Sequence, residues 1–171
     1  MNRTIIKLFF YLCILTALPS YAQNAVHYYF KTMDIRNGLS QNTVYQILQD
    51  RKGFMWFGTK DGLNRYDGLS YRVYKKENSG LGKNFITALY EDHEGNIWIG
   101  TDGGVFIYNP VLDSFTAFNQ TSDKGTVIKD FVTMIGSDEY DNIWISVENQ
   151  GLFCYNHEKR LWNYLDRKSV V

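Results

Sequence analysis

One stretch, "NTVYQILQDRKGFMWFGTKDGLNRYD" (residues 42–67), decides the fold, because two further segments of the chain repeat its pattern. They are "NFITALYEDHEGNIWIGTDGGVFIYN" (84–109) and "DFVTMIGSDEYDNIWISVENQGLFCYN" (130–156). An aspartate, a tryptophan and a tyrosine recur at matching places: Asp50, Asp92 and Asp138; Trp56, Trp98 and Trp144; Tyr66, Tyr108 and Tyr155. The tryptophans stand 42 and 46 residues apart. A period of about 40 to 50 residues is typical of propellers and solenoids.

Each repeat resolves into four short strands. In the first repeat, residues 44–49 are a mostly apolar run with β-branched and aromatic side chains, which suits an inner strand. Residues 54–59, 63–67 and 70–76 follow as the next strands, and residues 114–118 supply the fourth strand of the second repeat. Four strands joined by turns of about two to five residues form one blade of a β-propeller. The sequence therefore predicts an all-β fold of about three four-stranded antiparallel blades, an incomplete propeller, with repeats at approximately 38–79, 80–125 and 126–168.

The turn between the first two strands is "DRKG" in the first repeat and "DHEG" in the second. An aspartate side chain can bond the backbone ahead of it, and glycine takes the positive φ angle that such a turn needs. The third repeat has Asp141 in the place of glycine, and aspartate tolerates the left-handed region better than most residues. The pattern is also similar to the Asp-box of sialidase propellers, which is a structural turn remote from catalysis.

The aromatic residues of the second strand are interpreted as architecture. Successive side chains of a strand point to opposite faces, so Phe54 and Trp56 lie on one face and Met55 and Phe57 on the other. Both faces are apolar because each blade packs between two neighbours, and each tryptophan can bury about 150 to 250 Å² there. The glycines that follow, Gly58 and Gly100, are expected to leave room for an adjoining backbone or ring.

The stretch "GLSQNTVYQILQDRKGFMWFGTKDGLNRYDG" (38–68) resembles the two-component regulator propeller repeat. The pattern of that repeat runs Gly-Leu-Ser, Asn, a strand, Asp-x-x-Gly-x-x-Trp-x-Gly-Thr, then Gly-Leu and Tyr. The resemblance covers residues 27 to about 165. The first repeat matches closely and the second nearly so, whereas the third has Ser146 and Val147 where Gly-Thr is expected.

The resemblance implies a periplasmic sensor of the hybrid two-component systems found mainly in Bacteroidetes. Such a sensor binds carbohydrate fragments and signals to a cytoplasmic kinase. Full receptors of this kind carry more blades, an immunoglobulin-like domain, a membrane helix, a histidine kinase, a receiver and a DNA-binding module. We therefore expect this chain to be the N-terminal piece of a longer receptor, with the kinase outside it.

Three blades alone leave two open blade faces, which we expect to be lined with Trp, Phe and Ile. Exposed apolar patches of that size mark an interface or an aggregation hazard. The expected partners are further propeller blades of a longer receptor or copies of the same chain. Residues 27–34, "HYYFKTMD", are considered as a lone strand that completes the last blade of an intact ring.

The first residues have the plan of a secretory signal peptide. Arg3 and Lys7 give a basic start, residues 8–18 are an apolar run of eleven, and small residues precede a cut after Ala22. The alternative is an uncleaved membrane anchor, but eleven apolar residues are too few to cross a hydrocarbon core of about 30 Å. The chain is therefore divided into a signal peptide and a mature partial propeller without a membrane span, in the periplasm or secreted: residues 1–22 and 23–171.

The composition of the mature chain excludes several partners. Without Arg3 and Lys7, 16 basic residues face 18 acidic ones, a net charge of −2. A nucleic-acid surface would need a basic stripe, so no nucleic-acid partner is expected. One cysteine, Cys154, remains, which rules out an intrachain disulfide, and its apolar neighbours favour an inert thiol.

No motif predicts catalysis, a cofactor or a metal. The sequence has no nucleophile elbow, no phosphate-binding glycine loop and no Cys or His pair at metal spacing. The histidines, His27, His93 and His157, are scattered. Residues 92–103 superficially resemble a calcium loop, but Gly103 occupies the place of the closing glutamate. A propeller lyase or hydrolase would need His, Arg and carboxylates clustered on one face, so the chain is not expected to be an enzyme.

Binding residues are expected in the loops where the second strand meets the third and where one blade leads into the next, because loops on a rigid scaffold usually carry binding. These loops are 36–42, 59–62, 80–84, 101–104, 128–130 and 147–150. Their charged residues could bind sugar hydroxyls or an acidic sugar: Arg36, Lys60, Asp61, Lys83, Asp102, Lys129 and Glu148. Alternatively they are ordinary solvated turn residues, and the chain is a structural protein-interaction module without a small ligand.

Overall fold

The computed structural model describes residues 3, 27–120, 122, 125–156 and 161–165, the last range by its backbone alone. The chain forms two units, Met1–Thr32 and Met33–Val171. In the first unit, residues 27–32 belong to no helix or strand. The expected signal peptide lies outside the described residues, except for Arg3.

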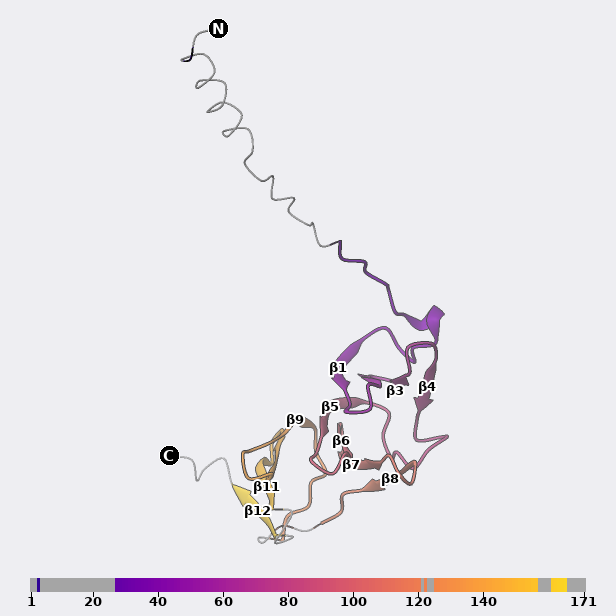
Figure 1. Cartoon of the computed structure of the whole chain (residues 1–171). Helices are drawn as coiled ribbons and strands as arrows, with labels where there is room; N and C mark the ends of the chain where they lie inside the picture. Colours follow the sequence, from indigo (N-terminus) through magenta and orange to yellow (C-terminus); the bar gives the residue numbers. More distant parts are fainter. Residues whose placement is uncertain (1–2, 4–26, 121, 123–124, 157–160, 166–171) are drawn as a thin grey trace. The chain divides into compact units, whose positions relative to one another are not determined.

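The second unit is built from strands (Figure 1), and a short 3-10 helix, Ile35–Asn37, precedes them. Blade 1 consists of β1 (Val44–Gln49), β2 (Met55–Thr59), β3 (Gly62–Tyr66) and β4 (Tyr71–Tyr74). Blade 2 consists of β5 (Ile86–Glu91), β6 (Ile97–Thr101), β7 (Gly104–Asn109) and β8 (Ser114–Ala117). Blade 3 consists of β9 (Val132–Ser137), β10 (Ile143–Val147), β11 (Gly151–Asn156) and β12 (Leu161–Leu165).

Each blade is an up-and-down sheet in which every strand pairs antiparallel with the next one along the chain. This is the four-stranded antiparallel blade that the sequence predicts, and β1 has the predicted bounds. The fourth strands are shorter than predicted, at four residues each in blades 1 and 2. Each sheet falls inside one of the expected repeat ranges.

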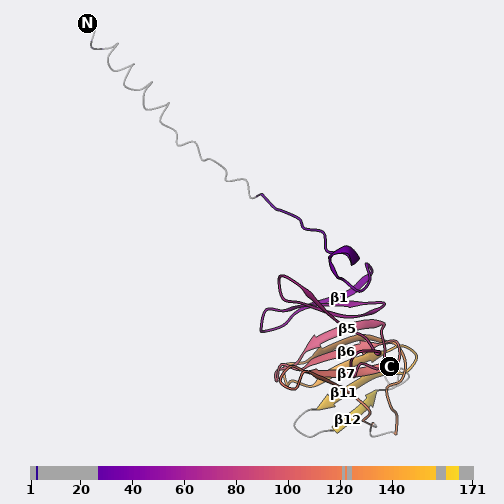
Figure 2. The same ribbon diagram turned by 90° about the vertical axis from the view of Figure 1, so that its right-hand side faces the viewer.

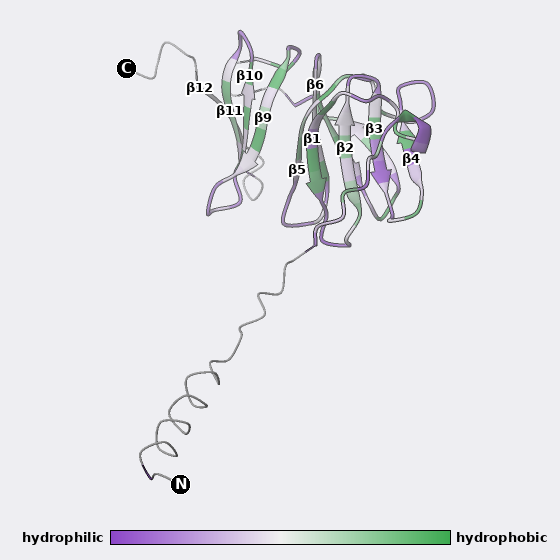
Figure 3. Ribbon diagram, turned by 90° about the horizontal axis from the view of Figure 1, so that it is seen from above, coloured by the Kyte–Doolittle hydropathy of each residue, from purple (hydrophilic) through white to green (hydrophobic). Residues whose placement is uncertain are grey.

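The blades pack face to face through their inner strands, because β1 contacts β5 and β5 contacts β9. Figure 2 shows the sheets of blades 1 and 2 as successive layers. In Figure 3 hydrophobic residues are concentrated along β1, β5 and β9, and the connecting loops are more hydrophilic. One buried apolar cluster joins blades 1 and 2 around Trp56 and Ile86, and a second joins blades 2 and 3 around Trp98 and Val132.

The aspartate turns fix the tryptophans. Asp50 Oδ1 accepts the backbone N–H groups of Lys52 and Phe54, at 3.0 and 2.9 Å, as predicted for this turn. Its Oδ2 accepts the indole N–H of Trp56 at 2.8 Å, a bond that the sequence analysis did not foresee. The same indole bond recurs at 2.8 Å in blade 2 and 2.9 Å in blade 3. The aspartate therefore closes the turn and sets the tryptophan that follows six residues later.

Each tryptophan of blades 1 and 2 faces the next blade. The Trp56 ring lies 5.1 Å from the Tyr108 ring of blade 2, and the Trp98 ring lies 5.9 Å from the Tyr155 ring of blade 3. The repeated tyrosine is thus the partner of the preceding blade's tryptophan. Within the described residues no blade precedes that of Tyr66, whose hydroxyl donates to the Gly68 carbonyl at 2.6 Å.

The repeated glycines make room for the next blade. A Cβ on Gly58 would lie 2.7 Å from Ile86 Cγ2, and a Cβ on Gly100 would lie 2.6 Å from Val132 Cγ1. The adjoining group is therefore a side chain of the next inner strand, not the backbone or ring that the sequence analysis expected. Blade 3 has Ser146 at this position, and its Oγ lies 2.9 Å from the hydroxyl of Thr133 on β9.

The open faces are less uniform than predicted. On blade 1, Ile47 is 60% exposed, whereas Phe57 is buried and its ring lies 6.1 Å from the ring of Tyr71. On blade 3, Trp144 is half-buried and Met134 is 67% exposed. The expectation of Trp, Phe and Ile on both faces is therefore wrong in detail, because among the described side chains only blade 3 presents a tryptophan on its open face. The proposed strand at residues 27–34 takes part in no sheet of the described chain.

Candidate functional site

The loops expected to bind a ligand come together at one end of the blades. The Gly62 amide in the β2–β3 turn donates to the Asn84 carbonyl, just before β5, at 2.7 Å. The Asp102 amide in the β6–β7 turn donates to the Phe85 carbonyl at 3.3 Å. The corresponding turn of blade 3 is joined to the start of β9 by a Glu148 amide bond of 2.8 Å. The turns are thus anchored to the inner strands.

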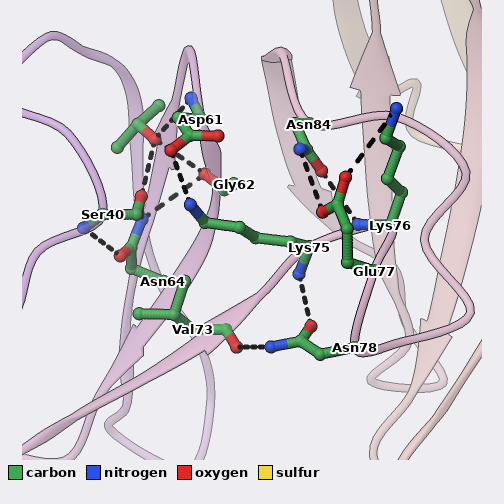
Figure 4. A network of polar contacts seen from close by, with 11 residues as sticks. Ser40, Asp61, Gly62, Asn64, Val73, Lys75, Lys76, Glu77, Asn78 and Asn84 are labelled. Carbon is green, nitrogen blue, oxygen red and sulfur yellow. Dashed lines mark hydrogen bonds and ion pairs between the residues drawn. The ribbon is translucent and has the colours of Figure 1, made fainter.

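Buried polar side chains hold the β2–β3 turn of blade 1. Thr59 Oγ1 donates to the Gly62 carbonyl at 2.9 Å and accepts the Asp61 amide at 3.1 Å. Asn64 is fully buried, and its Oδ1 accepts the backbone N–H of Ser40 at 2.8 Å. Figure 4 shows this network beside the turn. Because buried hydrogen bonds are costly to break, the turn presents Lys60 on a well-supported backbone.

A cavity of about 410 Å³ opens between this turn and the β6–β7 turn of blade 2. We name it the lysine cavity; its lining residues are Lys60, Lys76, Gly82, Lys83, Asn84, Phe85 and Asp102. The volume lies within the range of about 300 to 1,000 Å³ that is usual for ligand sites. Three lysines face one carboxylate in the lining, so the cavity is positively charged.

The acidic groups beside the cavity are already paired (Figure 4). Asp61 Oδ2 lies 2.5 Å from Lys75 Nζ, and Glu77 Oε1 lies 3.7 Å from Lys76 Nζ. The backbone N–H of Glu77 itself, with help from the Asn84 amide, lowers the pKa of the Glu77 carboxyl, which keeps it ionised. No other acidic group pairs with the remaining two lysines of the lining within the described residues.

The wall of the cavity includes one aromatic ring. Phe85 is half-buried, lies 4.7 Å from the ring of Tyr45 and 5.6 Å from the ring of Phe131, and so belongs to an aromatic row across the three blades. The sequence analysis missed Lys76 because it placed this residue in the strand predicted at 70–76, and it missed Phe85 because it ended the preceding loop at residue 84. An aromatic residue recurs at the beginning of each inner strand, and this recurrence could have indicated Phe85 from the sequence.

The predicted site residues divide into two groups. Lys60, Lys83 and Asp102 line the lysine cavity, and Asp61 adjoins it through the ion pair with Lys75. The other three residues, Arg36, Lys129 and Glu148, are exposed and do not line it.

Their local contacts explain this separation. Arg36 NH2 pairs with Asp34 Oδ2 at 2.5 Å next to the 3-10 helix, and this hydrogen bond lowers the pKa of the Asp34 carboxyl. The Lys129 amide donates to Gln150 Oε1 at 3.1 Å within blade 3, and Glu148 belongs to the β10–β11 turn of the same blade. Of the predicted residues, the structure therefore brings together only Lys60, Lys83, Asp102 and the adjoining Asp61.

A second cavity, of about 220 Å³, lies at the outer edge of blades 1 and 2. Here Arg72 of β4 pairs with Asp113 at 2.8 Å, and Tyr108 donates to the same carboxylate at 2.8 Å. The Tyr108 hydrogen bond and then Arg72 lower the pKa of the Asp113 carboxyl, and burial raises that of Tyr108. These groups satisfy one another and tie blade 1 to blade 2.

The described residues contain no group of three or more His, Cys, Asp or Glu side chains that could hold a metal ion. Both oxygens of Asp92 accept N–H groups of its own turn and of Trp98, so the superficial calcium loop is used as a structural turn. Burial raises the pKa of the Cys154 thiol, which disfavours a reactive thiolate. In the part of the chain that the structure describes, no helix is long and apolar enough to cross a membrane.

Comparison with known proteins agrees with the repeat. The two-component regulator propeller family matches residues 38–61 and 80–103. Histidine kinase P4 of Formosa agariphila is 42% identical over 59 residues, which are 34% of this chain and 4% of that protein. Two segments of the chain thus match the two-component regulator propeller repeat, and each match begins at the first residue of one of the first two expected repeats.

Solved structures extend the likeness to the third blade. The extracellular domain assigned to the hybrid two component system BT3049 of B. thetaiotaomicron has a TM-score of 0.72 at 27% identity, over 82% of this chain and 20% of that one. The extracellular domain of BT4673 from the same organism has a TM-score of 0.65 at 29% identity, over 75% and 19%. PorZ of Porphyromonas gingivalis shares the fold alone, with a TM-score of 0.55 at 16% identity, over 72% of this chain and 21% of that one. The propeller fold is confirmed, and the chain spans about a fifth of the structures it matches.

Proposed function

We propose that this chain, which carries two-component regulator propeller repeats, is part of the ligand-sensing propeller of a hybrid two-component receptor. In this proposal it is exported to the periplasm, recognises carbohydrate fragments and signals to a kinase that lies outside these blades. The solved structures that it resembles include the extracellular domains assigned to the hybrid two component system BT3049 and to the one component system BT4673, which supports the placement. Further blades complete the ring, and the chain itself performs no chemistry.

The observation that carries the proposal is the lysine cavity. It lies between turns of two adjacent blades, and buried hydrogen bonds support those turns. Its lining combines polar groups with the ring of Phe85, and binding pockets commonly pair a few placed polar groups with an aromatic wall. A pyranose ring has a face of C–H groups that packs on such a ring and an edge of hydroxyls that meets the polar groups.

The test is a calorimetric titration of the exported chain with each member of a panel of soluble oligosaccharides. We expect saturable binding of at least one member, and we expect Phe85→Ala to weaken it about tenfold, equivalent to about 1.4 kcal/mol. Ile47→Ala, on the open face of blade 1, is the matched control and should leave the affinity unchanged. Circular dichroism of each variant separates lost binding from lost folding. A folded chain that binds no member of the panel contradicts the proposal.

A second candidate function is a structural interaction module without a small ligand. The half-buried Trp144 and the exposed Met134 on the outer face of blade 3 favour it, because apolar groups gathered on a sheet face mark an interface. Light scattering over a range of protein concentrations tests for association through this face. Association that Trp144→Ala abolishes, together with no glycan binding, would favour this candidate.

A further inference from the structure

We infer that the lysine cavity selects saccharides that carry an anionic group, either a carboxylate or a sulfate. This inference rests on the proposed function and names the class of ligand for it. The chain as a whole carries equal numbers of basic and acidic residues, 18 of each, so an excess of three lysines over one carboxylate in a single cavity is a local feature.

Two of these lysines are available to a ligand. Lys60 and Lys83 have no ion pair within the described residues, whereas Lys76 pairs with Glu77 at the rim and Lys75 with Asp61. The two acidic groups beside the cavity, Asp61 and Glu77, are therefore neutralised by Lys75 and Lys76. An anion that enters meets two unpaired ammonium groups, and ammonium groups act as point charges toward carboxylate, sulfate or phosphate.

The neighbouring β6–β7 turn leaves space for the Lys83 side chain because residue 103 is a glycine. A Cβ on Gly103 would lie 2.5 Å from Lys83 Cε and 2.9 Å from its Nζ. The residue at the corresponding position of blade 1 is Asp61, so a side chain is compatible with this turn elsewhere in the molecule. The missing side chain at Gly103 is thus what allows Lys83 to lie across the turn, with its ammonium beside the cavity.

The one carboxylate in the lining does not cancel this charge. Asp102 is exposed, and its interaction with the lysines is screened by solvent. Phe85 supplies the apolar wall against which the sugar ring packs. The arrangement therefore suits a ligand that has an apolar ring face and an anionic substituent, such as a uronic acid or a sulfated sugar.

The test compares three tetrasaccharides on the exported chain by calorimetry: a galacturonic acid oligomer, which carries carboxylates alone, a sulfated galactose oligomer, which carries sulfates alone, and a neutral galactose oligomer. We expect an acidic member to bind at least about tenfold more tightly than the neutral one, since two charge-assisted contacts each contribute about a factor of five. The affinity should fall as salt rises from about 0.05 to about 0.5 M, because screening weakens exposed charge pairs. Which acidic member binds distinguishes the carboxylate from the sulfate.

The double variant Lys60→Gln and Lys83→Gln should bind the acidic ligand at least about tenfold more weakly, and its affinity for any neutral ligand should be unchanged. Lys52→Gln is the matched control, because this exposed lysine lies in the aspartate turn at the other end of the strands. As a second readout, the acidic ligand should protect Lys60 and Lys83, but not Lys52, from acetylation. Neutral glycans that bind while acidic ones do not would overturn the inference and leave the proposed function standing. Binding of the acidic ligand that the double variant does not alter would overturn it as well, and binding of no glycan would overturn both.

Discussion

The equivalent tryptophans of blades 2 and 3 provide a test of how much stability comes from blade packing. Trp98 is 2% exposed and packs on the rings of Phe118 at 5.2 Å and Tyr155 at 5.9 Å. Trp144 keeps the same indole bond to its aspartate, at 2.9 Å, but it is half-buried and has no ring contact within the described residues. The two side chains therefore share the turn contact and differ in the packing of a following blade.

Replacing each tryptophan by alanine removes the shared bond and, at Trp98 alone, the packing between blades. Truncation of a buried tryptophan costs about 3 to 5 kcal/mol, so Trp98→Ala should lower the free energy of unfolding by that amount. Trp144→Ala should cost about 1 to 2 kcal/mol, because it loses one hydrogen bond and part of the burial. The loss at Trp98 should therefore exceed the loss at Trp144 by about 1 to 4 kcal/mol.

The assay is equilibrium unfolding in urea, monitored by far-UV circular dichroism. Both variants and the unaltered chain are measured at low protein concentration. The slope of the free energy against urea must agree among the three proteins, since a changed slope signals a loss of two-state behaviour. Equal losses for the two variants would refute the reasoning, because they would mean that Trp144 is packed as fully as Trp98. If the loss at Trp144 grew with protein concentration, the packing would come from another copy of the chain.

Three further outcomes follow from the contacts between and within blades. Gly100→Ala should destabilise the fold by about 1 to 3 kcal/mol through overpacking against β9, whereas Gly136→Ala, where a Cβ meets nothing within 4 Å, should be close to neutral in the same urea assay. Arg51→Met removes hydrogen bonds from blade 1 to the aspartate turn of blade 2 and should cost about 1 to 2 kcal/mol, with Lys52→Met as the unaffected control. The Asn142 amide and the indole bond lower the pKa of Asp138 to about 2 from its usual 3.8. Its contribution to stability is therefore present above a pH of about 4 and lost as the pH falls towards 2, so the thermal midpoint of Asp138→Asn should depend less on pH in that window.

The sequence predicts the strands well because each blade is built from local signals. Alternating apolar residues, the aspartate turns and the recurring Trp56 and Tyr66 positions define four strands per repeat, and hydrogen-bonded pairs confirm them. Periodicity also places Trp56 and Phe57 on opposite faces, but it does not say which face meets the following blade. That depends on the stacking of sheets, which no local pattern encodes, and so the difference between the two open faces was not predictable.

The candidate site was predictable only as a set of loops. Turn chemistry identifies the β2–β3 and β6–β7 turns, and Lys60 and Asp102 are charged residues within them. Lys76 enters the cavity from the turn that follows β4, and Lys83 depends on the missing side chain of Gly103. Both are consequences of how two blades approach each other. A charge count along the sequence cannot distinguish a lysine paired at the rim from one that faces the cavity.

The departures of the third repeat show which contacts the Gly-Thr pair serves. In blade 2, Gly100 is required by the approach of Val132 from the following blade, whereas Thr101 Oγ1 donates to the Gly104 carbonyl of its own turn at 2.8 Å. The glycine is therefore needed for packing between blades and the threonine for a turn within one blade, although the two residues are adjacent in the sequence. Both residues differ in blade 3, and the structure differs from blade 2 at each of the two positions.

At the serine position, no inner strand of the described chain approaches, and Ser146 bonds within its own sheet. At the valine position, the hydroxyl that closes a two-residue turn is missing. The β10–β11 connection is one residue longer than its counterparts, and Asn149 within it takes the left-handed conformation, with a φ of 61°. Asparagine is among the residues that accept this region most readily. The third repeat thus keeps the aspartate, tryptophan and tyrosine that build a blade and relaxes the two residues whose contacts differ there.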